Sequence, residues 1–301
     1  MTASSAGKRF SPRRIVFTLG LVALVGLFVV LFVIPSKSAF VPLPEPNGYY
    51  VVLQAASRIE SGGADLTTNE IAELVIKNRA ALSEIRRAVE LPCVVPVRMD
   101  QRWIRRHSAE LSSFRRVAQA FDQETMFLQG PVANSEALNL CLELTRFSHA
   151  ISRNGLLVTA LQAMACETIA MKRINNLVSS LSAADCRRAA HALYEYDRDR
   201  ESPDEIGHRE AEWSRATYGV WAQLPLMVRG GTLRPDKAAM SSTQKIFYSN
   251  SRQARVIILQ LASRAFELEH GRKPQRSSEL VPAFLPSVPI DPASHAPLEI
   301  P

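Results

Sequence analysis

The side chain best placed for chemistry is Glu167, because it lies in the most apolar stretch of the chain, a predicted helix over residues 156–178. A carboxyl group buried without a partner has a raised pKa and can act as a general acid. The alternative is a salt bridge to an arginine such as Arg146 or Arg153, since buried charges are usually paired. The salt bridge is the favoured interpretation, and the acid is the alternative.

Two histidine–glutamate pairs have the spacing of metal ligands on a helix. His191 and Glu195 lie four residues apart, and His208 and Glu212 repeat this spacing. Two ligands do not make a zinc site, and neither stretch has the HExxH pattern. Ordinary surface pairing is favoured for both. The sequence therefore predicts no metal site, no cofactor site and no catalytic residue.

Two further polar residues, Asn78 and His107, fall on the apolar lines of their predicted helices. We expect hydrogen-bonded core side chains there rather than ligands. Four cysteines, Cys93, Cys141, Cys166 and Cys186, lack CxxC spacing. They permit either two disulfides or buried thiols, and both interpretations stay open.

The general features of the sequence exclude several function classes. The chain has 301 residues, 47% hydrophobic and 22% charged, which is typical of a folded protein. Much of the net charge of +7 comes from basic residues before position 15, and no basic stripe with interleaved aromatics follows. We therefore predict no nucleic-acid binding. Nucleotide-binding glycine loops and serine-hydrolase motifs are also missing, so an enzyme is less favoured than a binding protein.

Residues 15–35 predict a single membrane-spanning helix. The run from Ile15 to Ile34 has no charge, and at a helical rise of 1.5 Å per residue it is about 30 Å long, the thickness of the hydrocarbon layer. Basic residues precede it, so we expect the N-terminus in the cytoplasm and the rest outside, at the bacterial inner membrane. A cleaved signal peptide is the alternative, although this run is longer than usual for one.

The remaining sequence predicts an all-α protein. Apolar residues recur at helical spacing, no stretch alternates as a strand does, and no fixed repeat is present. We expect a multi-helix bundle or an irregular helical array with a proline-rich C-terminal tail. The predicted helices cover 49–60, 67 to the residue before Pro92, 99–121, 135–152, 156–178, 182–196, 204 to about 224, and 242–270. The predicted organisation is a basic tail (1–14), the membrane helix (15–35), a proline-rich spacer (36–47), a helical extracytoplasmic domain (48–272) and the tail (273–301).

The C-terminal segment carries a resemblance to a known family. After a helix come His270 and Gly271, then Pro274, then Glu279 with Leu280, and finally a P-x-DP element formed by Pro289, Asp291 and Pro292. This arrangement resembles the C-terminal segment of type II secretion pseudopilins, over about 40 residues of the chain. The resemblance implies that His270 and Asp291 shape the fold. The prepilin start is missing, since Val16 and Leu21 stand where glycine and glutamate are required.

The whole chain also resembles a loose group of uncharacterised envelope proteins with one N-terminal anchor, an Asn-Gly-Tyr start to the helical body, and this tail. That resemblance implies architecture and location, and no catalytic residue. The leading hypothesis is a membrane-anchored helical interaction or scaffolding protein of the bacterial envelope with an unknown protein partner. The alternatives are an envelope hydrolase with a buried acid site near Glu167, and an accessory of a secretion or pilus-like system.

Overall fold

The computed structural model describes residues 40–62, 66–128, 131–219 and 237–300. These residues belong to one compact unit that begins at Phe40. The predicted membrane helix, residues 15–35, and the basic tail before it lie outside the described residues. Within the described ranges, no helix has both the length and the apolar character needed to cross a membrane.

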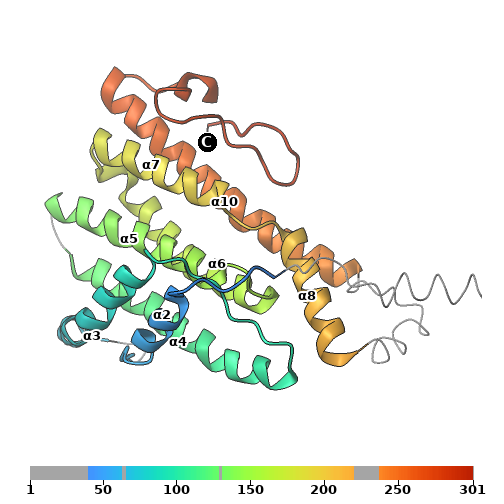
Figure 1. Cartoon of the computed structure of the whole chain (residues 1–301). Coiled ribbons are helices and arrows are strands. Elements are labelled where there is room, and N and C mark those ends of the chain that lie inside the picture. Colours follow the sequence, from blue (N-terminus) through green and yellow to red (C-terminus); the bar gives the residue numbers. More distant parts are fainter. Residues whose placement is uncertain (1–39, 63–65, 129–130, 220–236, 301) are drawn as a thin grey trace, which may run out of the picture. The chain divides into compact units, whose positions relative to one another are not determined.

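The described residues are organised in helices, which confirms the all-α prediction (Figure 1). Across those ranges the extended pairing is limited to an isolated antiparallel bridge between Ile290 and Pro297. The elements are α2 (Gly48–Ala56), α3 (Thr68–Ala88), α4 (Gln101–Phe127), α5 (Pro131–Ser152), α6 (Leu157–Leu177), η1 (Val178–Ser180), α7 (Ala183–Arg198), α8 (Pro203–Tyr218), α10 (Lys237–His270) and η3 (Ser277–Leu280).

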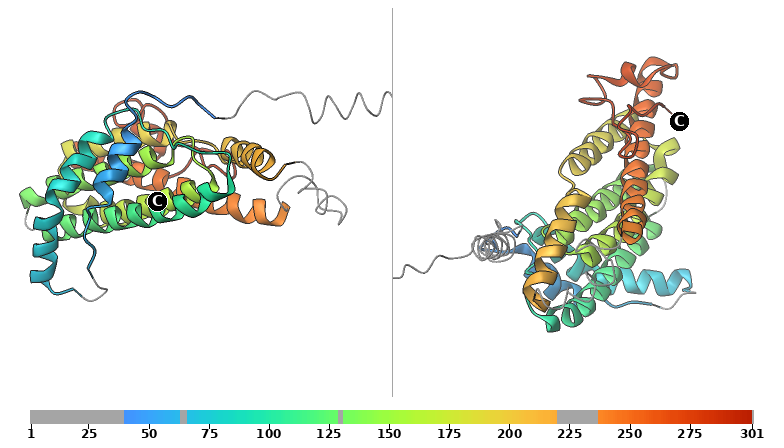
Figure 2. Two further views of the ribbon diagram at one scale, coloured as in Figure 1. Left: turned by 60° about the horizontal axis from the view of Figure 1, so that its bottom comes forward. Right: turned by 90° about the vertical axis from the view of Figure 1, so that its right-hand side faces the viewer.

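Two helix pairs make the most extensive contacts. Helix α7 packs along α10, and α5 packs along α6 (Figures 1 and 2). Helix α4 contacts both α5 and α6, while α2 and α3 pack together beside it. Aromatic side chains fill the region between α4 and α5: the ring centroid of Phe147 lies 5.9 Å from that of Phe114 and 6.3 Å from that of Phe121. These ring contacts fix α4 and α5 relative to each other.

Several of the helices begin at a residue whose side chain caps the helix. Thr67 and Glu70 form the predicted capping box at α3, in which Thr67 Oγ1 accepts from the Glu70 amide and Glu70 accepts from the Thr67 amide. The hydroxyl of Ser182 likewise accepts from the Asp185 amide at the start of α7. These bonds satisfy amides that have no partner within the helix.

The Asn-Gly-Tyr start of the helical body joins three parts of the domain. Asn47 Oδ1 accepts from the amides of Tyr49 and Val94, and Asn47 Nδ2 donates to the Val94 carbonyl. The amide of Gly48 donates to the Pro92 carbonyl at 3.0 Å. The hydroxyl of Tyr49 reaches α4, where it donates to Glu110 at 2.8 Å. Each residue of this triplet thus makes a different contact that holds the start of α2 in place.

Position 48 requires glycine because neighbouring atoms lie too close to its backbone to leave room for a side chain. A Cβ at this position would overlap the Ala88 carbonyl oxygen, lie 2.7 Å from Cys93 Sγ and lie 3.0 Å from Leu91 Cβ. We expect Gly48→Ala to destabilise the protein by about 1–3 kcal/mol because the surrounding atoms must move. The measurement is the midpoint of urea unfolding. Adding Cys93→Ala removes one of the overlaps, so partial recovery is expected, and an unchanged midpoint for Gly48→Ala alone would contradict the argument.

The C-terminal tail packs back onto the helical domain. Gly271 ends α10 in the left-handed conformation, with φ of 68°, as its position in the sequence predicts. Ser277 Oγ then donates to the Leu298 carbonyl at 2.8 Å, and Leu298 belongs to the buried core. In Figure 1 the tail (red) lies beside α10 and α7. His270 stacks on Phe266, and Asp291 accepts from two amides of its own turn, so both contribute to the fold as expected.

Candidate functional site

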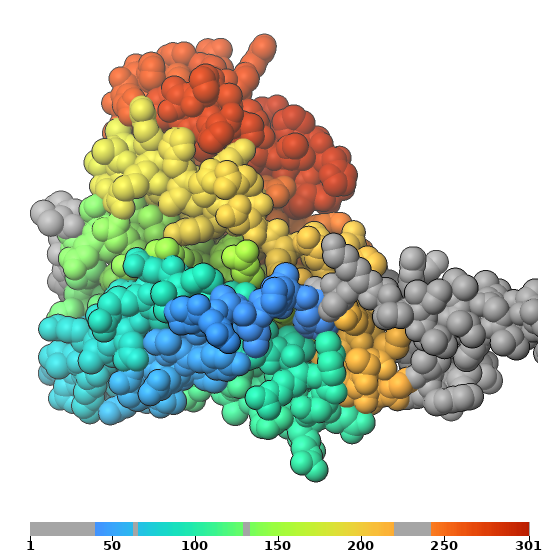
Figure 3. All heavy atoms as spheres, in the orientation of Figure 1, coloured from blue at the N-terminus to red at the C-terminus, as the bar shows by residue number. Residues whose placement is uncertain are grey.

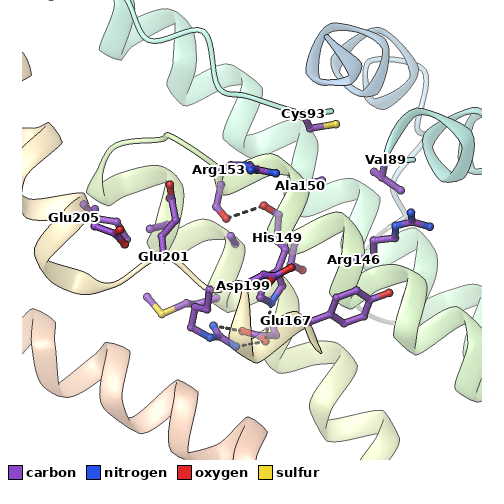
Figure 4. A pocket seen from close by; sticks show the side chains of 18 of the residues that line it. Val89, Cys93, Arg146, His149, Ala150, Arg153, Glu167, Asp199, Glu201 and Glu205 are labelled. Carbon is purple, nitrogen blue, oxygen red and sulfur yellow. Dashed lines mark hydrogen bonds and ion pairs between the residues drawn. The ribbon is translucent and has the colours of Figure 1, made fainter. Parts of the chain in front are cut away.

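An open groove of about 650 Å³ lies where α5, α6 and the segment between α7 and α8 meet. Residues 89–93, which follow α3, form another part of its wall. Val41 lines it as well, and the amide of Val41 donates to Asn154 Oδ1 at 3.0 Å. In Figure 3 the N-terminal residues of the described chain (blue) lie at the surface, with the α7 region (yellow) above them and the α4 region (teal) below. Figure 4 shows the side chains that line the groove.

Glu167 lies at the base of this groove and is held by an arginine. Its two carboxylate oxygens accept from Arg200 Nη2 at 2.6 Å and Arg200 Nη1 at 2.9 Å, which is the bidentate geometry of a strong ion pair (Figure 4). His149 Nε2 lies 3.4 Å from Glu167 Oε1. Arg200 Nη1 also donates to Asn250 Oδ1 at 3.2 Å. The side chain of Glu167 is only 3% exposed.

The environment of Glu167 lowers its pKa. Burial alone would raise the pKa, but the charge of Arg200 and the hydrogen bond from His149 outweigh burial and bring the pKa to about 2. The alternative of an unpaired acid with a raised pKa is therefore wrong, and Glu167 is ionised at neutral pH. The prediction of an arginine partner is confirmed, but Arg146 and Arg153 are the wrong arginines. Both lie near the C-terminal end of α5, whereas the actual partner follows α7.

The ion pair belongs to a network that reaches the C-terminal tail. Arg200 Nε donates to Asp197 Oδ1 at 3.3 Å, and Asp197 Oδ2 accepts from Arg255 Nε at 2.6 Å. Arg255 also donates to the Ile290 carbonyl. The network thus joins α6, the end of α7, α10 and the tail. We interpret Glu167 as a buried structural anion rather than a reactive group.

A second buried cluster has the order of a nucleophile, a base and an acid. Thr159 Oγ1 lies 2.7 Å from His107 Nε2, and His107 Nδ1 lies 2.7 Å from Glu110 Oε2. This order matches the hydrogen-bonded chain of serine and threonine nucleophiles. However, Thr159 has no exposed surface and His107 is only 1% exposed, so a substrate cannot reach the hydroxyl. The hydrogen bonds of this cluster, together with the bond from Tyr49 to Glu110, link α2, α4 and α6.

The two predicted core polar residues are confirmed as hydrogen-bonded. His107 has the partners just described, and the side-chain amide of Asn78 accepts from the Glu60 amide and donates to the Glu60 carbonyl, each at 2.9 Å. Asn78 is 1% exposed. Both residues therefore satisfy their polar atoms inside the core.

The two histidine–glutamate pairs lie on two different helices, α7 and α8. Glu195 forms an ion pair with Arg198 at 2.5 Å on α7, and His208 and Glu212 lie on α8. Within the described parts of the chain, His, Cys, Asp and Glu side chains do not come together in a group of three that could hold a metal ion.

The four cysteines are all free and buried. The disulfide interpretation is therefore wrong, and the buried-thiol interpretation is confirmed. Burial raises the pKa of each thiol, to about 11 for Cys93, Cys166 and Cys186 and to about 12 for Cys141. A thiol with such a pKa carries little thiolate at neutral pH and is a poor nucleophile.

No protein-family model matches the chain, and neither a curated protein nor a solved structure matches it. The groove is therefore the feature of the described residues from which a function can be inferred.

The groove contains residues that the sequence did not single out as a site. Arg200 belongs to the charged run after α7, a pattern that ordinarily marks a solvated loop, yet its side chain is only 16% exposed. A usable signal was present on α5: Arg146, His149 and Arg153 are spaced three and four residues apart, so they share one helix face. All three line the groove.

Proposed function

We propose that the chain is a membrane-anchored helical interaction protein of the bacterial envelope, and that a protein partner binds in the groove between α5, α6 and the α7–α8 segment. The anchor is proposed from residues 15–35 of the sequence. The observation that supports binding is the open groove whose buried acid, Glu167, is already neutralised by Arg200.

The charges around the groove favour binding over hydrolysis. A hydrolase of the kind considered for Glu167 needs a carboxyl group that carries a proton and a second group free to accept one. Glu167 is ionised and paired. Glu201 accepts from Arg209 at 2.6 Å and from the Asn154 amide at 3.0 Å. Glu205 caps α8 through Ser202. These carboxylates already have structural partners, so we do not favour the hydrolase.

The apolar surface of the groove also suits a protein partner. Val41 is 49% exposed and Leu91 is 37% exposed, although both are apolar. Met164, Ile206 and Phe247 contribute buried apolar side chains to the lining. Binding sites for peptides and ligands commonly combine such apolar surface with a few polar groups. Covering Val41 and Leu91 would remove apolar surface from water.

Photocrosslinking tests where the partner binds. A photoreactive amino acid at Val41 or at Leu91, in the full chain in cells, is expected to give the same discrete crosslinked protein from both positions. The matched control is Ile76 on α3, which is 64% exposed but does not line the groove. Adding Val41→Trp should reduce crosslinking from Leu91 by filling the groove. Equal crosslinking from Ile76, or none from the groove positions, would contradict the proposal.

The proposed membrane attachment has its own test. After an alkaline carbonate wash we expect the full chain to stay with the membrane fraction, because an apolar helix of about 20 residues is held by the hydrocarbon layer. Protease added to intact spheroplasts should digest the domain, since the basic residues before the anchor favour a cytoplasmic N-terminus. Release by carbonate would refute the anchor, and protection from protease would refute the orientation.

A further inference from the structure

One wall of the groove is basic. Arg146 and His149 lie on one face of α5, and Arg153 continues that face just after the helix ends. All three line the groove, and Figure 4 shows them on the side that also carries Val89 and Cys93. His149 is occupied by Glu167. The two arginines are therefore the groups on this wall whose charges are left for a ligand.

These two arginines lack strong partners of their own. The guanidinium group of Arg153 has no hydrogen-bond acceptor or ion-pair partner among the residues that the structure describes. Among the described residues Arg146 has one ion-pair partner, Glu90 at 3.4 Å, and the two side chains are 43% and 65% exposed. An exposed ion pair of that length contributes little and is readily exchanged for another anion.

The carboxylates of the groove, in contrast, are already occupied. Glu167 binds Arg200, and Glu201 binds Arg209 and an amide. Glu205 accepts from Ser202, and Asp199 accepts from Arg198 Nε at 3.2 Å. The formal charges of the lining balance, with four arginines against four carboxylates, but the arginines without a short ion pair, Arg146 and Arg153, make their part of the groove locally positive.

Arg146 and Arg153 line the groove together with Cys93. The thiol of Cys93 lies close enough to Arg146 and Arg153 that each positive charge lowers its pKa, although burial is the larger influence and raises the pKa overall. Next to Cys93, the partly exposed Leu91 supplies apolar surface. Two guanidinium groups beside an apolar patch are complementary to a ligand in which a carboxylate neighbours an apolar group.

We infer that the groove binds an acidic peptide segment of the partner, with a carboxylate held between Arg146 and Arg153 and a neighbouring apolar side chain against Leu91 and Val41. This inference rests on the proposed function and names the chemistry of the partner. It requires no bond to form or break.

The surroundings favour a peptide over a membrane surface. The arginines lie in a concave groove, whereas Glu90 beside Arg146 and Glu205 at the other end remain negatively charged around it. A flat anionic bilayer that approached the arginines would also approach these carboxylates, and like charges repel. A single extended segment can occupy the part of the groove formed by Arg146, Arg153 and Leu91, which lies on the opposite side from Glu205 (Figure 4).

Fluorescence anisotropy with a labelled peptide tests the inference. The probe alternates leucine with aspartate, and its counterpart alternates leucine with asparagine. With the full chain in a neutral detergent, we expect the acidic peptide to bind at least about tenfold more tightly than the amide peptide, the effect of one charge-assisted contact. Arg146→Gln with Arg153→Gln should abolish this preference. The matched control is Arg102→Gln with Arg105→Gln, which removes equal charge from exposed positions of α4.

The outcomes of this experiment and of the crosslinking experiment test the inference and the proposed function separately. Equal binding of both peptides, or an equal loss in the α4 control, overturns the inference. Displacement of the peptide by inorganic phosphate or by a short-chain phosphatidylglycerol at lower concentration than by free acidic peptide overturns the choice of a peptide. If crosslinking from Val41 and Leu91 captures one partner while acidic peptides fail to bind, the proposed function stands and only the acidic class is wrong. If both experiments fail, the proposed function is wrong as well.

Discussion

Glu167→Leu is expected to lower the free energy of unfolding by about 3–5 kcal/mol, because it removes one partner of a buried ion pair and leaves the other charged. The remaining charge is Arg200, whose side chain is 16% exposed and is held by Asp197 and Asn250 as well. Arg200 would lose both short bonds to the carboxylate and remain a largely buried charge. Urea unfolding followed by circular dichroism measures the effect, provided that the denaturant slope is unchanged.

The matched control removes both charges together. Glu167→Leu with Arg200→Met replaces the pair by apolar side chains, so no unpaired charge is left in the core. We expect most of the lost stability to return, to within about 2 kcal/mol of the natural protein. Asp197 keeps an ion pair with Arg255 in that variant. If the double variant is as unstable as the single one, packing around Glu167 rather than charge explains the loss.

Acid is expected to weaken the domain through the same carboxylate. The pKa of Glu167 is about 2 in the folded protein and 4.5 as its ordinary value. A carboxyl group with a lower pKa in the folded state favours folding wherever it is ionised. Its contribution is therefore complete above about pH 5 and is lost as the pH falls towards 2, by about 3 kcal/mol in total. Urea midpoints measured from pH 7 down to pH 2 report this loss.

Other carboxylates change with pH too, so the comparison must be made with a variant. Asp185 has a lowered pKa because its hydrogen bonds to Arg188, Ser182 and Ser135 outweigh burial, and it acts in the same direction as Glu167. Burial raises the pKa of Glu210, which acts in the opposite direction. Both remain in the Glu167→Leu, Arg200→Met double variant. That variant should show a flatter dependence on pH, and identical curves would show that Glu167 is not the group responsible.

Local signals in the sequence located most of the helices. Apolar spacing and capping residues such as Thr67 and Ser182 describe bonds within a few residues of each other, which a single sequence reveals directly. The differences lie at helix ends. Helix α4 continues to Phe127 instead of ending at Phe121, since the intervening residues contain no helix breaker. Helix α5 begins at Pro131 instead of Ser135, since proline is well tolerated in the first turn.

The residues of the candidate site were much harder to predict from the sequence than the helices. Its composition depends on contacts between residues far apart in the sequence, such as Glu167 with Arg200 and Val41 with Asn154. Several arginines lie within reach of a helix that contains one buried acid. Helical spacing does not show which of these arginines pairs with the acid. Burial of Glu167 could be predicted, but the direction of its pKa depended on the partner that the fold supplies.

The bonds around Asn47 also determine how the domain would respond to a mechanical load. Tension along the chain before Phe40 would load the hydrogen bond from Val41 to Asn154 and the two bonds between Asn47 and Val94. Val41 and Asn47 precede α2, and Val41 is part of the groove wall. A pull from that side would therefore act on the groove wall through Val41 as well as on the start of α2.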